Sequence, residues 1–167
     1  MILIDSLRSV LSFKKEFDEA LFKPFQETIK TSKAQIVTLH MMGSHWYYDN
    51  RYTDAHRKFL PVTNSKYIPS QSAEQLINAY DNTIVSLDNF LNETISSLSN
   101  VKEPCIMVYL SDHGERLGEN GKWLHAETAE EATNTACVIW YSDTFERVFP
   151  YQTKALIENQ TPLCPKK

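Results

Sequence analysis

The sequence predicts an α/β fold in which a mainly parallel central sheet is flanked by helices. Three short apolar runs, rich in β-branched residues, have the character of buried strands, and they span residues 34–40, 105–110 and 136–141. Buried parallel strands read as continuous apolar stretches of this kind. A long helical pattern separates the first two runs, which places a helix against the expected sheet.

Two main helices accompany these strands. Apolar side chains recur at three- and four-residue steps through residues 18–30, with Pro24 at a first turn or a kink. The second helix is expected to begin after Ser72, because Ser72 and Gln75 form a capping box. Its apolar positions share one face: Leu76, Ile77, Tyr80, Ile84, Leu87, Phe90, Leu91, Ile95 and Leu98. Short helices or loops are expected in residues 126–135, 144–148 and 153–159.

Length and composition favour one domain. A chain of 167 residues with 42% hydrophobic content can bury one core, so we expect a single domain over residues 1–167. Its two ends, residues 1–15 and 160–167, are expected to be poorly anchored. The net charge of -4 and the scattered lysines provide no basic surface for nucleic acid. The longest apolar runs have the length of strands, so none spans a bilayer and the chain itself is expected to be soluble. Cys105 and Cys137 lie inside apolar runs, where free buried thiols are expected.

The segment richest in functional signals is residues 105–126, which read CIMVYLSDHGERLGENGKWLHA. Asp112 and His113 stand where the expected strand ends, and three of the four glycines of the chain lie in the loop that follows. Ligands of open α/β sheets bind outside the carboxyl ends of strands. A carboxylate oxygen beside an imidazole nitrogen suits Zn²⁺ or a similar divalent cation, and His125 returns twelve residues after His113. The alternative is that Asp112 caps a turn, His113 is an ordinary loop residue and His125 is a partly exposed residue at a helix end.

A second histidine loop follows the first apolar run. The strand expected at residues 34–40 ends at His40, interpreted as a packed residue, and His45 follows after a short turn. Because both strands deliver histidines to loops at the same kind of end, the two loops can converge on one site. Residues 46–59 are polar and aromatic, which indicates either a surface loop whose rings pack or a substrate-facing wall. Within them, Arg51 could hold a phosphate by its planar fork or form an ordinary salt bridge.

These loops resemble motifs of the phosphoethanolamine transferases, lipid A-modifying enzymes of the alkaline phosphatase and sulfatase superfamily. One motif is matched by SDHGE, LGENG and the final Leu-His pair within residues 111–125. The histidine loop of the family is matched by LHMMGSH, Tyr48, NRY and KFLP within residues 39–61. A third likeness, Gln75-Leu76, Tyr80-Asp81-Asn82-Thr83 and Asp88, falls in the helix between them. The resemblance runs in one order from about residue 18 to residue 142 and implies an alkaline phosphatase/sulfatase-like fold.

The resemblance also implies the chemistry of the site. In the related transferases the residues that match Asp112 and His113 bind the catalytic zinc. The residues that match His45 and His125 contact the phosphorylated intermediate or a second zinc. The implied donor is phosphatidylethanolamine, the implied acceptor is lipid A or another envelope glycan, and the full-length protein is implied to act at the periplasmic face of the bacterial inner membrane.

The resemblance further implies that this chain carries part of the active site. The family takes an acidic zinc ligand, a threonine nucleophile and a membrane-spanning region from segments upstream of the histidine loop, and nothing in residues 1–35 resembles them. The chain is therefore expected to be the carboxyl-terminal part of an incomplete catalytic domain, inactive alone, with an exposed sheet edge through which it could self-associate. Two other interpretations remain open: a sulfatase or phosphodiesterase-type hydrolase, and a catalytically inactive truncated domain.

Three further residues of the loop that contains Asp112 and His113 are of interest. Glu115 and Glu119 are candidates either to support the metal ligands or to face solvent. Arg116 replaces the small residue that is usual in the family, so we expect it to alter the local charge at the metal.

Overall fold

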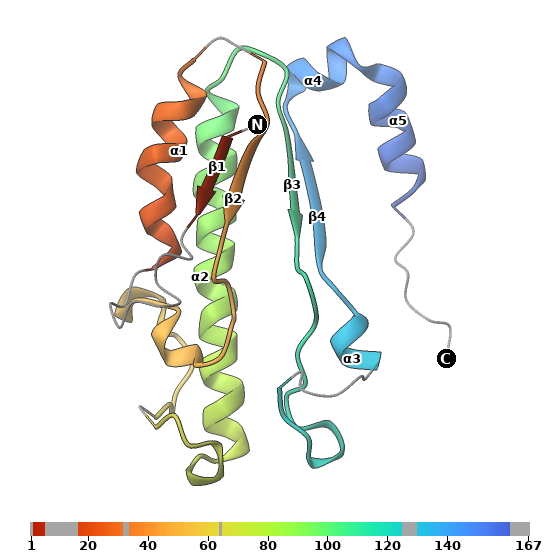
Figure 1. The fold of residues 1–167 in the computed structure, drawn as a ribbon. Coiled ribbons are helices and arrows are strands. Elements are labelled where there is room, and N and C mark those ends of the chain that lie inside the picture. The colour runs from red at the N-terminus through yellow and green to blue at the C-terminus, as the bar shows by residue number, and fades with distance from the viewer. Residues whose placement is uncertain (1, 6–16, 32–33, 64, 125–129, 161–167) are drawn as a thin grey trace.

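A computed structural model describes residues 2–5, 17–31, 34–63, 65–124 and 130–160, and the statements below concern these residues. Strand β1 (Ile2–Asp5) pairs in parallel with β2 (Val37–His40), and β3 (Ile106–Leu110) pairs antiparallel with β4 (Cys137–Tyr141). Figure 1 shows that β2 and β3 run in the same direction, so their carboxyl ends lie at the same end of the molecule. The three predicted strands are confirmed, although β4 joins β3 in the antiparallel sense.

Strand β1 was not predicted, because residues 2–5 were assigned to a poorly anchored end. All four of its residues pair with β2, from Ile2 opposite Val37 to Asp5 opposite His40. The expectation for most of the remaining terminal residues falls on positions 6–15 and 161–167, which lie outside the described residues.

The main helices begin where the sequence predicts. Helix α2 (Ala73–Ser99) starts with the capping box, in which the Gln75 amide donates to Ser72 Oγ at 3.1 Å and the Ser72 amide donates to Gln75 Oε1 at 2.9 Å. Helix α1 (Phe22–Ile29) follows a 3₁₀ turn and carries Pro24 in its first turn, where the absent amide hydrogen costs no hydrogen bond. The Phe22 and Phe90 rings stack at 4.5 Å and join α1 to α2. No helix of the described residues is long and apolar enough to cross a bilayer.

Three shorter helices complete the chain: α3 (Glu130–Thr133), α4 (Asp143–Val148) and α5 (Pro150–Glu158). Ser142 caps α4 by accepting the Phe145 amide at 3.2 Å, and its Oγ also accepts the Cys105 amide at 3.1 Å. One hydroxyl thus ties the start of α4 to the start of β3. In Figure 1, α4 and α5 lie beyond β4, on the side away from α1 and α2.

The most buried apolar side chains include two tyrosines of the histidine loop, and none of them belongs to the described strands. Tyr48 and Tyr52 are each 1% exposed and pack near the buried face of α2, where Leu76 is 2% exposed. The prediction that rings of this loop pack together is confirmed for Tyr48, which packs edge-on against Trp46 and Tyr80, but both tyrosines are buried rather than at the surface. The prediction of buried strands was also wrong, because Val108 is 60% exposed.

The exposure of the strands has a geometric cause. Each strand pairs with one neighbour in a two-stranded sheet, and Ile106, Val108 and Leu110 alternate along one face of β3 that the described residues leave open. The thiol of Cys137 is exposed for the same reason, whereas that of Cys105 is partly buried; both are free.

A buried amide joins the loop to α2. Asn82 is 0% exposed; its Oδ1 accepts the Lys58 and Phe59 amides at 2.7 and 2.8 Å, and its Nδ2 donates to the Phe59 carbonyl at 3.0 Å. Nδ2 also lies 3.4 Å from the Tyr52 hydroxyl. Every hydrogen-bonding position of this side chain therefore serves to hold the far end of the loop against the helix.

Replacing Asn82 by alanine is expected to lower the free energy of unfolding by about 2–3 kcal/mol, because loop amides and a carbonyl lose their buried partner. Urea denaturation followed by circular dichroism measures the change. Asn92→Ala is the matched control, since Asn92 is an exposed asparagine of the same helix, and its effect is expected to stay within about 0.5 kcal/mol. Equal effects of the two substitutions would contradict the anchoring role.

Candidate functional site

The loop after β3 is held in a sharp turn. The Ser111 amide continues the pairing by donating to the Ala136 carbonyl at 3.0 Å, and the Gly114 amide donates to the Ala132 carbonyl at 2.8 Å. A Cβ atom on Gly114 would lie 2.1 Å from the Glu131 carbonyl oxygen, so only glycine fits between this loop and α3. The turn leaves Asp112 exposed and His113 partly exposed at the carboxyl end of β3.

A hydrogen bond to the backbone orients the His113 ring. Nδ1 lies 2.8 Å from the Gly114 carbonyl oxygen, which can only accept, so Nδ1 carries a proton and donates it to this bond. Nε2 lies 3.9 Å from Asp112 Oδ1. Two ligand atoms of a tetrahedral zinc ion stand about 3.3 Å apart, given metal–ligand distances of about 2.0 Å. A small side-chain rotation therefore brings both donors onto one ion, and this pair fits a divalent metal.

The histidine loop is fixed at its start by Asp18, which precedes α1. Its two carboxylate oxygens accept the consecutive amides of Met42 and Gly43, at 2.9 and 2.8 Å. Gly43 has a φ of +54°, which glycine adopts without strain. From α2, the Thr83 hydroxyl bonds to Ser44 Oγ at 2.6 Å. The turn before His45 is thus held from two separate elements.

Arg51 fixes the other side of His45. Its Nε donates to the His45 carbonyl at 2.9 Å and its Nη2 to the Trp46 carbonyl at 3.3 Å. Burial lowers the pKa of the Arg51 guanidinium, and the nearby Asp18 carboxylate acts in the opposite direction. These contacts brace the loop backbone, and phosphate binding by Arg51 stays a prediction.

His45 itself is exposed, and its ring is oriented in the same way as that of His113. Its Nδ1 lies 2.5 Å from the Trp46 carbonyl oxygen, which can only accept, so Nδ1 donates to that carbonyl. A ring N–H that donates to a carbonyl is typical of metal-binding histidines.

The structure brings together part of the predicted set. Asp112 and His113 are adjacent, whereas the described residues contain no group of three or more His, Cys, Asp or Glu side chains arranged to hold one ion. His125 lies outside the described residues, so its convergence with His45 and His113 stays a prediction. His40 ends β2 as expected, although its side chain is exposed rather than packed.

The loop beyond Gly114 is braced by Arg116, which is 5% exposed. Its Nε donates to the Leu124 carbonyl at 2.9 Å, and the Leu124 amide donates to the Arg116 carbonyl at 3.1 Å. Glu119 is exposed and accepts the Leu117 amide at 2.7 Å. Arg116 therefore closes the base of this loop, a role that differs from the expected change of charge at a metal.

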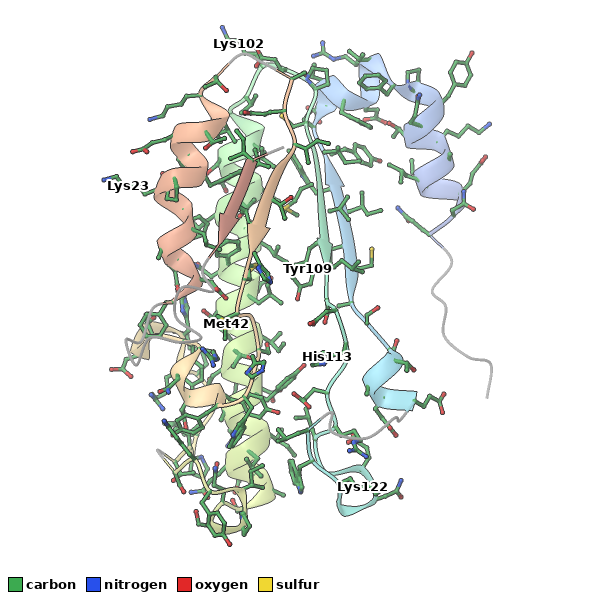
Figure 2. All side chains as sticks on the ribbon, in the orientation of Figure 1. Lys23, Met42, Lys102, Tyr109, His113 and Lys122 are labelled. Carbon is green, nitrogen blue, oxygen red and sulfur yellow. The ribbon has the colours of Figure 1, made fainter. Side chains whose placement is uncertain are left out.

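Figure 2 shows the labelled Tyr109 and His113 on the side of β3 and its loop that faces Met42, at the carboxyl end of β2. Burial raises the pKa of the Tyr109 hydroxyl, and the carboxylates of Asp112 and Asp18 raise it further. Tyr109 thus lies within the electrostatic reach of Asp112 and of Asp18, the carboxylate that holds the histidine loop. The arrangement is that of two histidine-bearing loops at one end of two strands, and residues 5–162 match the sulfatase family.

The chain belongs to the sulfatase family.

Relatives of this sulfatase-family chain include phosphoethanolamine transferases. The chain is 36% identical over 154 residues to phosphoethanolamine transferase EptA of Helicobacter pylori. The aligned residues cover 88% of the chain and 29% of that enzyme. The chain therefore spans less than a third of the length of this relative. The predicted resemblance to the phosphoethanolamine transferases is confirmed.

Solved structures confirm the fold class of this sulfatase-family chain. The soluble domain of lipooligosaccharide phosphoethanolamine transferase A from Neisseria meningitidis superposes with a TM-score of 0.73 at 37% identity, over 78% of this chain and 41% of that one. The integral membrane protein EptA from the same organism gives 0.74 at 37% identity, over 78% of this chain and 26% of that protein. The carboxyl-terminal periplasmic domain of Escherichia coli EptC, solved as a complex with Zn, superposes with a TM-score of 0.70 at 23% identity. The match covers 83% of this chain and 41% of that one, and at this identity it shows the fold alone.

Asp18 was missed as a site residue because it lies 24 residues before the turn that it holds. Replacing it by alanine is expected to raise the hydrogen-exchange rates of the Met42 and Gly43 amides at least about tenfold, because each loses a charged acceptor. Exchange measured by NMR reports this directly. Asp88→Ala, which removes an exposed carboxylate of α2, is expected to leave both rates unchanged. Wild-type rates in the Asp18 variant would show that the turn is held by other contacts.

Proposed function

We propose that this chain is part of the catalytic domain of a zinc-dependent phosphoethanolamine transferase. The full-length protein would transfer phosphoethanolamine from phosphatidylethanolamine to lipid A or another envelope glycan, at the periplasmic face of the bacterial inner membrane. One support is the similarity to enzymes named phosphoethanolamine transferases. The other is that the loops after β2 and β3, which contain His45 and His113, lie at the same end of the molecule.

The observation that carries the proposal is the arrangement of Asp112 and His113. The Asp112 carboxylate and the His113 Nε2 atom are 3.9 Å apart. The Gly114 carbonyl orients the imidazole by accepting a hydrogen bond from Nδ1. In the proposal these two side chains hold zinc. A zinc ion bound there supplies Lewis acidity toward phosphoryl oxygens and lowers the pKa of a coordinated hydroxyl group.

The remaining histidines serve the transferred group in this proposal. His45 would contact a phosphoryl oxygen through Nε2, since its Nδ1 is engaged by the Trp46 carbonyl. His125 is proposed to act in the same way, on the resemblance alone. The third protein ligand of the metal and the nucleophile are proposed to lie in a different part of the polypeptide, since the chain spans 29% of the length of the related enzyme.

Metal binding by the chain is tested with Zn²⁺ and a competing chromophoric chelator after exhaustive dialysis. Wild type is expected to bind Zn²⁺, and His113→Ala is expected to weaken binding at least about tenfold, because one of two neighbouring donors is lost. His40→Ala is the matched control, since His40 is an exposed histidine at the end of the neighbouring strand β2. Absence of metal in wild type would indicate that this part of the site is not formed in the isolated chain.

A hydrolase is the second candidate, because the matched family is named for sulfatases. An assay of a full-length protein that contains this sequence distinguishes the two reactions. The protein is given either phosphatidylethanolamine with lipid A or an aryl sulfate ester. We expect mass spectrometry to show phosphoethanolamine on lipid A and no sulfate release, with transfer lost in His113→Ala. Sulfate release that depends on His113 would support the hydrolase instead.

A further inference from the structure

The segment that leads from the histidine loop to α2 exposes several large apolar side chains. Leu60 is 65% exposed, Tyr67 is 68% exposed and Phe59 is 44% exposed. Single exposed apolar residues are ordinary on a protein surface, whereas a group of them in one short segment indicates a contact surface. Two exposed lysines, Lys58 and Lys66, stand directly beside them in the sequence. These five residues are called the basic–apolar surface below.

The first half of this surface is fixed to α2. Asn82 accepts the Lys58 and Phe59 amides through its buried side chain. Asn78, one turn earlier in the helix, donates from Nδ2 to the Pro61 carbonyl at 3.0 Å. These bonds hold the backbone in place, so the exposure of the apolar side chains is a property of the fold rather than of a loose loop.

The second half is closed by a turn around Tyr67. The Tyr67 amide donates to Ser65 Oγ at 3.1 Å, and the Tyr67 carbonyl accepts the Ser70 hydroxyl at 2.7 Å. Gln71 Nε2 donates to the Ser65 carbonyl at 2.6 Å. Backbone groups that are satisfied within the segment need no water, which lowers the free energy needed to place the segment against lipid.

The same segment is basic within an acidic chain. Residues 57–73 contain one arginine, two lysines and no aspartate or glutamate, whereas the whole chain has a net charge of -4. The arginine, Arg57, is paired with two carboxylates at 3.2 Å each, so the remaining charge is that of Lys58 and Lys66. Lysines beside exposed aromatic and aliphatic side chains are typical of segments that lie in the interface of an anionic bilayer.

The basic–apolar surface is also tied to the candidate site. Tyr47, two residues after His45, donates its hydroxyl to the Thr63 carbonyl at 3.1 Å. Figure 1 shows residues 58–72 beside the first turn of α2, at the end of the molecule where β2 and β3 have their carboxyl ends. A partner that meets this surface therefore lies at the same end of the molecule as the two histidine-bearing loops.

We propose that Lys58, Phe59, Leu60, Lys66 and Tyr67 form a contact surface for an anionic phospholipid bilayer. The apolar side chains enter the boundary between headgroups and acyl chains, and the lysines remain at the level of the lipid phosphates. The proposal rests on the proposed function for its purpose, because a transferase that takes its donor and acceptor from a membrane needs its site next to the lipid. Contact here would hold the histidine loop at a fixed height over the headgroups.

The test is co-sedimentation of the chain with vesicles of phosphatidylethanolamine and phosphatidylglycerol, compared with vesicles in which phosphatidylcholine replaces the phosphatidylglycerol. Wild type is expected to bind the anionic vesicles at least about tenfold more tightly than the neutral ones. Leu60→Gln/Tyr67→Gln is expected to weaken binding to anionic vesicles about tenfold, because apolar contact area is lost. Lys58→Gln/Lys66→Gln is expected to remove the preference for anionic lipid.

Matched controls remove the same kinds of side chain from other exposed positions. Ile36→Gln/Tyr151→Gln replaces an aliphatic and an aromatic side chain that are 69% and 85% exposed, one before β2 and one in α5. Lys23→Gln/Lys102→Gln is the control for charge, and Figure 2 shows Lys102 at the opposite end of the molecule. Both controls are expected to bind anionic vesicles as wild type does.

Three results would overturn the proposal. One is equal loss of binding in the surface variants and in their controls. Another is equal binding of wild type to both lipid mixtures. The third is no binding of wild type to either, which would leave the surface to a protein partner. Circular dichroism of each variant confirms that it is folded, and the lysine pair tests the surface independently of the apolar pair.

Failure of the proposed function gives a different result. Zn²⁺ binding is measured on the same variants, and it is expected to be unchanged in Leu60→Gln/Tyr67→Gln because the basic–apolar surface contains no proposed metal ligand. Vesicle binding that depends on Leu60 and Tyr67, in a chain that binds no Zn²⁺, upholds the contact surface and counts against the metal site. Zn²⁺ binding without vesicle binding refutes the contact surface alone.

Discussion

The attachment of the histidine loop to α2 is the constraint on which the rest of the structure depends. Asn82 accepts two hydrogen bonds and donates two in a fully buried setting, and Thr83, the next residue of the helix, bonds with Ser44. A long helix is a rigid support, and a buried amide that is fully satisfied tolerates no alternative partner. Two adjacent residues of α2 therefore hold opposite ends of the histidine loop, with His45 between them.

The bracing of this loop explains how an exposed histidine can be well ordered. Asp18 engages the amides before His45, and Arg51 engages the carbonyls of His45 and Trp46. The backbone is thus saturated with partners, and the imidazole can meet a ligand without the loop having to order first. Preorganisation of this kind reduces the entropy that binding would otherwise cost.

Local signals in the sequence predicted the parts of this arrangement that depend on local physics. The capping box placed the start of α2, and the apolar runs placed the strands, because neighbouring residues decide both. Burial was mispredicted for β3 and β4, since exposure depends on what covers a sheet. Asp18 acts on a partner that is distant in sequence, so no spacing rule could pair it with Met42. The predicted role of His125 stays a prediction, because His125 lies outside the described residues.

The two proposed metal ligands are positioned by residues next to them in the sequence, unlike the rest of the site. Asp112 and His113 are neighbours in sequence, and a carbonyl of the next residue sets the tautomer of the imidazole, so this pair needs little more than the turn at Gly114. A third ligand must arrive from another segment, and its distance from the pair depends on tertiary structure. The histidine loop and the loop that carries the pair follow strands of two different sheets, β2 and β3, so tertiary packing decides that distance. The chemistry of the pair is therefore local, whereas its incorporation into a complete site depends on how the two sheets pack together.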